Sequence, residues 1–101
     1  MNVQAFKLIT GDDIIGDVVW DYEAEEMIIE QPAGIHMQFD GSGRVEVALI
    51  PWVLYSEQKK FKISFSNILC QIDPNTELVN QWNQQFGRGL VVPSSGKQII
   101  S

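Results

Sequence analysis

The stretch from Phe6 to Val19, FKLITGDDIIGDVV, decides the fold: two apolar runs flank Gly-Asp-Asp, and a second glycine follows the first at a spacing of five. Gly11 ends the first run, and two acids follow it. This pattern is typical of a hairpin turn in which glycine supplies a positive φ. Gly16 lies inside the second run, where glycine normally costs stability. We therefore expect a sharp bend or a close backbone approach at Gly16, as in the coiled second strand of a small barrel.

The alternation of apolar and polar residues predicts five strands. Pro32, Gly34 and Pro51 fall inside long strand patterns, where a proline belongs at an edge or a bulge, so we expect kinks there. Strongly bent strands with tight connections predict a small closed antiparallel barrel. The expected strands cover residues 3–10, 14–22, 27–39, 44–55 and 61–72.

The spacing of apolar residues changes to three and four after residue 72, which predicts one short amphipathic helix over residues 74–86. Asp73 is the expected N-cap, and Gly87 is the expected C-cap. The domain organisation is then a barrel over residues 1–72, a helix over 73–87 that packs on the barrel or on a neighbouring subunit, and a tail over 88–101. The Leu90-Val91-Val92 run of the tail could add an edge strand to the barrel or to a neighbour.

The composition restricts the classes of partner. The chain of 101 residues has a net charge of −6, and residues 1–30 hold eight of its thirteen acids. This balance argues against duplex DNA as a partner, because such binding depends on neutralising phosphates. The apolar runs are too short to span a membrane. The single cysteine, Cys70, is expected to be a small buried residue in a reducing, cytoplasmic protein.

No catalytic constellation is visible, so we expect no enzymatic activity, no cofactor and no metal. His36 has no Cys or His partner at metal-binding spacing. Lys59, Lys60 and Lys62 could follow a phosphate backbone, or they could be solvated residues that protect a strand edge. Tyr22 could stack on a base, or it could pack on the rim of the barrel.

The opening stretch resembles the first half of the first Sm motif of Sm and LSm proteins. The motif reads apolar-x-apolar, Gly-x-x-apolar-x-Gly, x-apolar, and it covers residues 6–18; as an architecture the resemblance extends over residues 3–72. The chain is similar to short Sm-like proteins of phage type. The resemblance implies a five-stranded, strongly bent Sm-like (SH3-like) barrel. The one short C-terminal helix expected from the apolar spacing departs from the family, whose helix commonly precedes the first strand. It also implies a homo-oligomeric ring formed by edge-strand pairing, with single-stranded RNA as the ligand. The matched residues are Phe6, Leu8, Gly11, Ile14, Gly16 and Val18.

Two departures from the family concern the site that holds a stacked base. Acids fill the segment from Trp20 to Met27, where the family has an apolar-Asn pair, and Phe65-Ser66 stands where the family has Arg-Gly. An RNA site would have to be rebuilt from other residues. The first hypothesis is a non-enzymatic Sm-like ring protein that binds RNA; the alternative is a structural or adaptor protein of the same fold that binds another protein. The candidate RNA-binding residues are Tyr22, Arg44, Lys59, Lys60 and Lys62.

Overall fold

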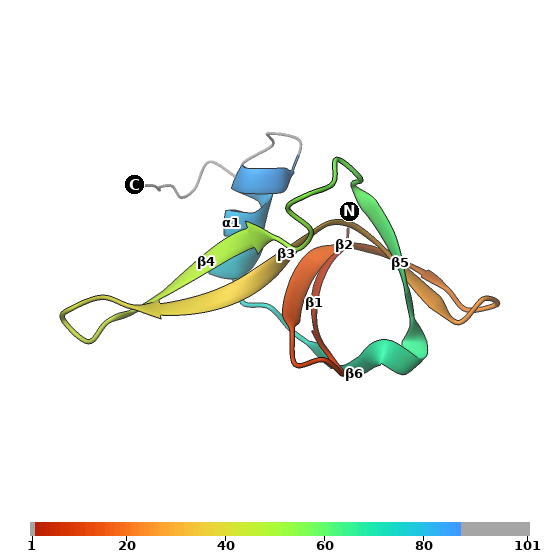
Figure 1. Cartoon of the computed structure of the whole chain (residues 1–101), viewed down its shortest axis with the longest axis horizontal. Helices are drawn as coiled ribbons and strands as arrows, with labels where there is room; N and C mark the ends of the chain where they lie inside the picture. Colours follow the sequence, from red (N-terminus) through yellow and green to blue (C-terminus); the bar gives the residue numbers. More distant parts are fainter. Residues whose placement is uncertain (1, 88–101) are drawn as a thin grey trace.

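The computed structural model describes residues 2–87, which form six antiparallel strands, a short 3-10 helix and one α-helix (Figure 1). The chain is mostly β, as the alternation predicts. No helix in this range is long and apolar enough to cross a bilayer. The strands are β1 (Val3–Leu8), β2 (Asp13–Asp21), β3 (Glu26–Phe39), β4 (Val45–Pro51), β5 (Lys60–Ser64) and β6 (Ile68–Ile72), and the helices are η1 (Phe65–Asn67) and α1 (Thr76–Phe86).

The strands form one bent sheet in the order β4-β3-β2-β1-β6, with β5 paired to the first half of β3. Within the described residues no ladder joins β5 to β6, so the sheet curls without closing. The prediction of a closed barrel of five strands is therefore wrong in closure and in the number of strands. The expected fourth strand ends at Pro51, which has no N–H to donate, and the expected fifth strand is divided by η1 into β5 and β6.

The two glycines of the opening stretch act in different ways. Gly11 has a φ of 94°, which lets the β1–β2 turn reverse the chain. Gly16 is constrained by space: a Cβ there would lie 2.6 Å from Cγ1 of Ile29 and 2.9 Å from the carbonyl oxygen of Glu30. Only a residue without a side chain lets β3 approach β2 this closely.

A β-bulge in β3 lies opposite Gly16. The β2–β3 ladder shifts its register there, so that one residue of β2 faces two residues of β3, Gln31 and Pro32. Gln31 has a φ of 54°, in the left-handed region. The kink expected at Pro32 is thus a bulge, which bends the strand and increases its twist.

The bulge changes the face toward which β3 directs its odd-numbered residues, because one extra residue reverses an alternation of period two. Before the bulge, Met27 and Ile29 face the inside of the curl; after it, Ala33 and Ile35 face the outside. The sheet therefore carries a core on each face. The buried residues of the inner core are Phe6, Leu8, Ile14, Val18, Met27, Ile29 and Ile63. Those of the outer core are Ala5, Ile15, Ala33, Leu49 and Trp82.

The helix α1 covers the outer core. Its one buried residue, Trp82, donates a hydrogen bond from Nε1 to the carbonyl oxygen of Gln31 at 2.9 Å, so the helix is anchored on the bulge. The side chain of Asn75 accepts a hydrogen bond from the N–H of Leu78 and is the N-cap. The prediction of Asp73 as N-cap is wrong by two residues, whereas Gly87 is the C-cap as expected.

The β3–β4 hairpin extends beyond the rest of the sheet (Figure 1). The pairing of β2 with β3 stops at Gly34, whereas β4 pairs with β3 as far as Phe39. We call residues 35–49 the arm. It projects from the side of the molecule opposite the β2–β3 turn. In its outer part, residues 35–39 of β3 pair with β4 and with no other described strand.

Candidate functional site

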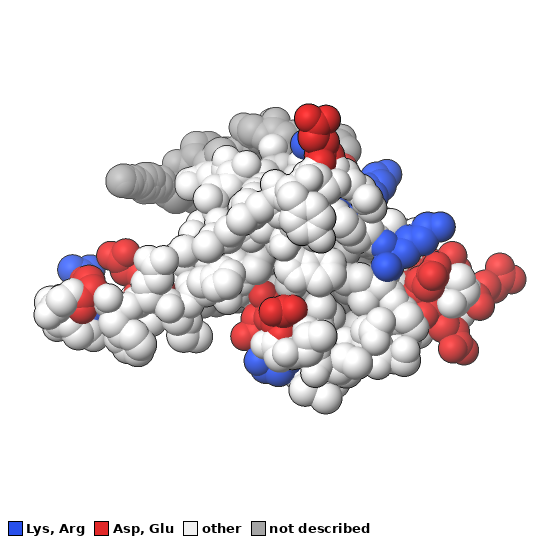
Figure 2. Space-filling model, viewed as in Figure 1, with Lys and Arg blue, Asp and Glu red and all other residues white. Residues whose placement is uncertain are grey.

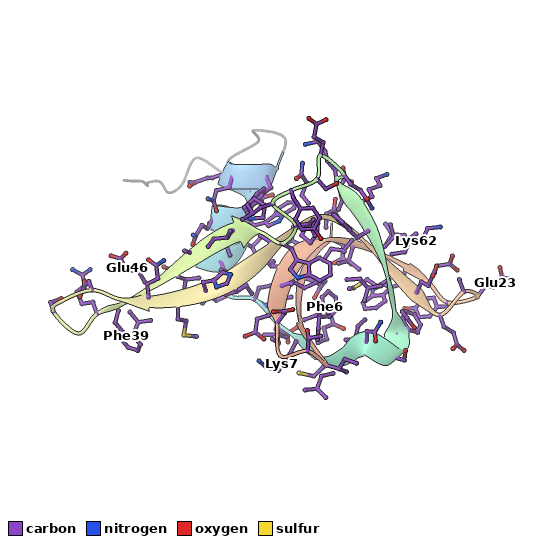
Figure 3. All side chains as sticks on the ribbon, in the orientation of Figure 1. Phe6, Lys7, Glu23, Phe39, Glu46 and Lys62 are labelled. Carbon is purple, nitrogen blue, oxygen red and sulfur yellow. The ribbon has the colours of Figure 1, made fainter. Side chains whose placement is uncertain are left out.

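An aromatic cleft lies between the β2–β3 turn and the 3-10 helix η1. Its volume is about 380 Å³. Phe6, from β1, is fully buried and forms the floor, inside the curl of the sheet (Figure 3). The lining residues are Phe6, Trp20, Tyr22, Phe65, Ile68 and Gln71.

Local structure explains why the two sides of the cleft meet. Tyr22 follows the last residue of β2, in a turn where the side chain of Asp21 accepts a hydrogen bond from the N–H of Ala24. Phe65 opens η1, and its own N–H donates to the carbonyl oxygen of Glu25 at 2.9 Å. The backbone bond from Phe65 to Glu25 holds the two turns together.

The rings form a continuous aromatic wall. Trp20 lies edge-to-face with Phe6, with ring centroids 5.6 Å apart, and stacks on Tyr22 at 6.4 Å. Tyr22 in turn contacts Phe65 edge-to-face, at 6.1 Å. The residue Tyr22 is 74% exposed. The cleft therefore offers an accessible ring above an apolar floor, which suits a flat ring or an apolar chain. Among these six lining residues, Tyr22 carries the only titratable group, a phenol.

The surroundings of the cleft are acidic. The β2–β3 turn carries carboxylates on both sides of Tyr22, and they form a red cluster at one end of the molecule (Figure 2). Glu23 lies at the tip of this turn (Figure 3). Among the described residues, no lysine or arginine lines the cleft. The acids of the turn are Asp21, Glu23, Glu25 and Glu26.

The structure brings Lys59, Lys60 and Lys62 together, all exposed, on and just before β5. In the ladder Lys60 pairs with Glu30, and Lys62 pairs with Ile28 two residues along, on the same face. Lys60 therefore stands opposite a carboxylate of β3, which reduces the positive potential that it offers to a phosphate. They lie outside the lining of the aromatic cleft.

Arg44 does not join this group. It lies in the turn at the tip of the arm, at the end of the molecule opposite the β2–β3 turn (Figure 1). The candidate residues thus fall into three separate places: Tyr22 in the cleft, the three lysines along β5, and Arg44 at the arm. Phe65 was missed by the sequence reasoning as a site residue, although the comparison with the Sm motifs had already drawn attention to Phe65-Ser66.

The described part of the chain contains one ion pair, between Nζ of Lys7 and Oδ1 of Asp13 at 2.7 Å. This contact satisfies an otherwise unpartnered buried carboxylate oxygen. The hydrogen bond to Asp13 raises the pKa of Lys7 above its ordinary value. The pair ties β1 to β2 at the start of the hairpin and takes no part in the cleft.

The prediction that Cys70 is buried is wrong. Cys70 pairs with Lys7 in the β1–β6 ladder and is exposed, because this position of β6 faces away from the inner core. Within residues 2–87, no group of three or more His, Cys, Asp or Glu side chains is placed to hold a metal ion.

Comparison with known protein families finds no family model that matches the chain. Comparison with curated proteins finds no significant match either.

Proposed function

We propose that the chain is a non-enzymatic, Sm-like ring subunit that holds a base of single-stranded RNA in the aromatic cleft. The observation that carries the proposal is the contact between Tyr22 and Phe65. These two residues come from the two turns in which the Sm motifs place the residues that hold a base. Aromatic rings would here replace the Asn and Arg of the family.

The arrangement of the strands supports the Sm-like part of the proposal. β6 pairs with β1, β1 with β2 and β2 with a long bent β3, and a 3-10 helix precedes the last strand. Gly16 allows the tight curl that the first Sm motif requires. The β4 and β5 segments together take the place of one long bent strand, interrupted after Pro51.

Free strand edges support the ring. Within the described residues, β5 pairs only with β3 and β6 pairs only with β1, so each presents one unpaired edge. Pairing β5 of one subunit with β6 of the next would satisfy both edges and repeat around a closed ring. Light scattering after size exclusion should give a mass several times 11.4 kDa at micromolar concentration. A monomer under these conditions would contradict the ring.

Stacking supplies the expected affinity. Stacking of a base on an aromatic side chain contributes about 1–3 kcal/mol, whereas the acidic turn repels the phosphates beside it. We therefore expect RNA binding to strengthen as salt rises, because salt screens this repulsion, which is opposite to the usual behaviour.

The test is a titration of the full chain with fluorescently labelled oligo-U at two salt concentrations. Tyr22→Ala and Phe65→Ala should each lower the affinity by about 5- to 150-fold, the equivalent of one lost stacking contact. Tyr55→Ala is the matched control, because Tyr55 is 92% exposed and lies outside the cleft. Replacing Lys59, Lys60 and Lys62 together by Gln tests whether the lysines contribute. No oligo-U binding would reject RNA as the ligand, and equal losses from Tyr22→Ala and Tyr55→Ala would reject the cleft as its binding site.

The acidic turn favours a second candidate, an adaptor of the same fold that binds a protein. A Lys or Arg side chain of a partner could lie on the ring of Tyr22 while Glu23 and Glu25 neutralise its charge. Binding of this kind weakens as salt rises, because attraction between charges is screened. The same titration with a labelled Arg- and Lys-containing peptide therefore separates the two functions by the sign of the salt effect.

A further inference from the structure

The outer part of the arm leaves one edge of β3 unpaired. Residues 35–39 pair with β4 on one side, and no other described strand pairs with them on the other. Exposed edges are usually protected from further pairing by charged residues, by proline or by a bulge. Residues 35–39 contain no Lys, Arg, Asp, Glu or Pro, and their ladder with β4 runs without a shift of register. This edge is therefore open to another strand.

The direction of the backbone groups along this edge follows from a hydrogen bond to the other side of the arm. The N–H of Asp40 donates to the carbonyl oxygen of Arg44 at 3.0 Å, so the even-numbered residues of this part of β3 direct their N–H and C=O groups toward β4. Successive residues of a strand direct these groups to opposite sides. Met37 and Phe39 therefore direct theirs away from β4, to the free edge.

We propose that this edge pairs with the same edge of a second copy of the chain, antiparallel and about a two-fold axis at Gln38. In this register Met37 of each copy lies opposite Phe39 of the other, so the two residues exchange their free N–H and C=O groups. Their exposed fractions in the single chain are 71% and 76%. A methionine sulfur beside an aromatic ring is a favourable contact, and cross-strand pairs of this kind stabilise a sheet.

The polar face of the arm matches in the same register. Even-numbered residues lie on this face, so Gln38 meets Gln38 of the second copy, and His36 lies opposite its Asp40. Two amides can bond each other through oxygen and N–H, and an imidazole N–H can donate to a carboxylate. The edge is therefore complementary to itself on both faces, which favours a second copy over an unrelated strand.

Charge favours the same occupant. The tip of each arm lies at the base of the other, so Arg44 of one copy comes beside Asp12 and Asp13 of the second. These two acids line one cleft with His36, next to the free edge, and an arginine beside them is attracted. The larger acidic cluster of the β2–β3 turn lies at the end of the molecule opposite the arm (Figure 2), so the pairing keeps the two clusters apart.

The arm pairing differs from the contact proposed for the ring. It leaves the free edges of β5 and β6 untouched, and a two-fold axis joins molecules, or rings, two at a time. Its tests therefore give the same answer whether or not the ring forms.

Disulfide trapping tests the register. Gln38 and its counterpart form a non-hydrogen-bonded pair, whose Cα atoms lie about 4.5 Å apart, within the range of a disulfide. In a Cys70→Ser background, which removes the exposed natural thiol, Gln38→Cys should form disulfide-linked dimers on mild oxidation, seen under denaturing conditions.

Glu46→Cys is the matched control for this cross-link. Glu46 is exposed and pairs with Gln38 within one arm, so its counterpart in the second copy would lie three strand spacings, about 14 Å, away. Dimers should form several-fold faster from Gln38→Cys than from Glu46→Cys. Equal rates, or no dimer from Gln38→Cys, would overturn the proposal.

The mass of the full chain tests the edge itself. Met37→Pro removes an outward N–H and no bond to β4, so it should halve the mass measured by light scattering. Val45→Pro is its control, because Val45 lies on the same face and directs its N–H to the outer edge of β4, and it should keep the parent mass. An unchanged mass in Met37→Pro, or an equal loss in both variants, would overturn the pairing at this edge. Circular dichroism checks that both variants fold; if either does not, the disulfide comparison decides alone.

Discussion

The two halves of β3 have the same alternation of apolar and polar residues, but their apolar side chains differ in burial. Met27 and Ile29, in the first half, are completely buried, with β2 on one side and β5 on the other. Met37 and Phe39, in the second half, are more than two-thirds exposed, because only β4 accompanies them. Within each half, an alternating pattern therefore establishes which residues share a face, but neighbouring elements decide whether that face is covered.

The bulge at Gln31 separates the two halves. It turns the first half toward the inner core and the second half toward the outer core and the arm. The indole of Trp82 binds the carbonyl oxygen of Gln31, so the helix stabilises the junction itself. The curled half is thus a packed core, whereas the outer part of the arm is an exposed apolar surface.

The strongest test of this contrast compares two methionines of one strand. Met27→Ala should lower the free energy of unfolding by about 2–5 kcal/mol, because it leaves a cavity in a packed core. Met37→Ala should cost about 1 kcal/mol or less, as surface substitutions do. Urea unfolding followed by tryptophan fluorescence measures both. Equal losses would mean that the arm is as tightly packed as the curl.

A smaller effect is expected from adding one methyl group at each of two glycines. Gly16→Ala should cost about 1–3 kcal/mol, because the new Cβ meets a backbone oxygen that cannot move without shifting β3. Gly41→Ala, in the turn of the arm, has no atom within 4 Å of the new Cβ and should change stability by no more than about 0.5 kcal/mol. The same unfolding assay applies, and an unaffected Gly16→Ala variant would show that the close approach of β2 and β3 is not required.

The smallest expected effect concerns the arm's own turn. Asp40 accepts hydrogen bonds from the hydroxyl of Ser42, from the N–H of Ser42 and from the N–H of Arg44. These bonds, with that of the Ser42 side chain the largest, hold the pKa of Asp40 below its ordinary value. A depressed pKa in the folded state contributes stability above the unfolded pKa, and this contribution is lost as pH falls through the folded value.

We therefore expect the amide resonances of Ser42 and Arg44 to titrate only at acid pH, below the ordinary range of an aspartate, with little change in melting temperature. Nuclear magnetic resonance of the labelled chain measures this. Asp40→Ala should abolish the acid-dependent shift. A midpoint at or above the ordinary aspartate value would show that the turn does not form these bonds in solution.

Much of the fold follows from local signals. Strand alternation, the positive φ at Gly11 and the helix C-cap at Gly87 depend on neighbours in the chain, and the structure has a strand, a turn and a helix end where these signals place them. The closed barrel and the N-cap at Asp73 were wrong. The N-cap depends on where the helix begins: α1 starts at Thr76, and the side chain of Asn75 accepts a hydrogen bond from the N–H of Leu78.

The sequence identified only part of the candidate site. Tyr22 was identified as a stacking residue, but its partner Phe65 lies on a distant segment that η1 and a backbone bond to Glu25 bring alongside. The exposure of Cys70 and the separation of Arg44 from the lysines have the same cause. Each depends on which segments lie side by side, and residue spacing does not specify that.

The sequence by itself determined the β-rich class, the two special glycines and the amphipathic helix, because these depend on backbone conformation and on the period of apolar residues. Only the tertiary structure decided that the sheet stays open, that a bulge divides its apolar residues between two faces, and that an aromatic cleft forms between two turns. These features depend on long-range pairing, in which one inserted residue reverses the face of every residue that follows it.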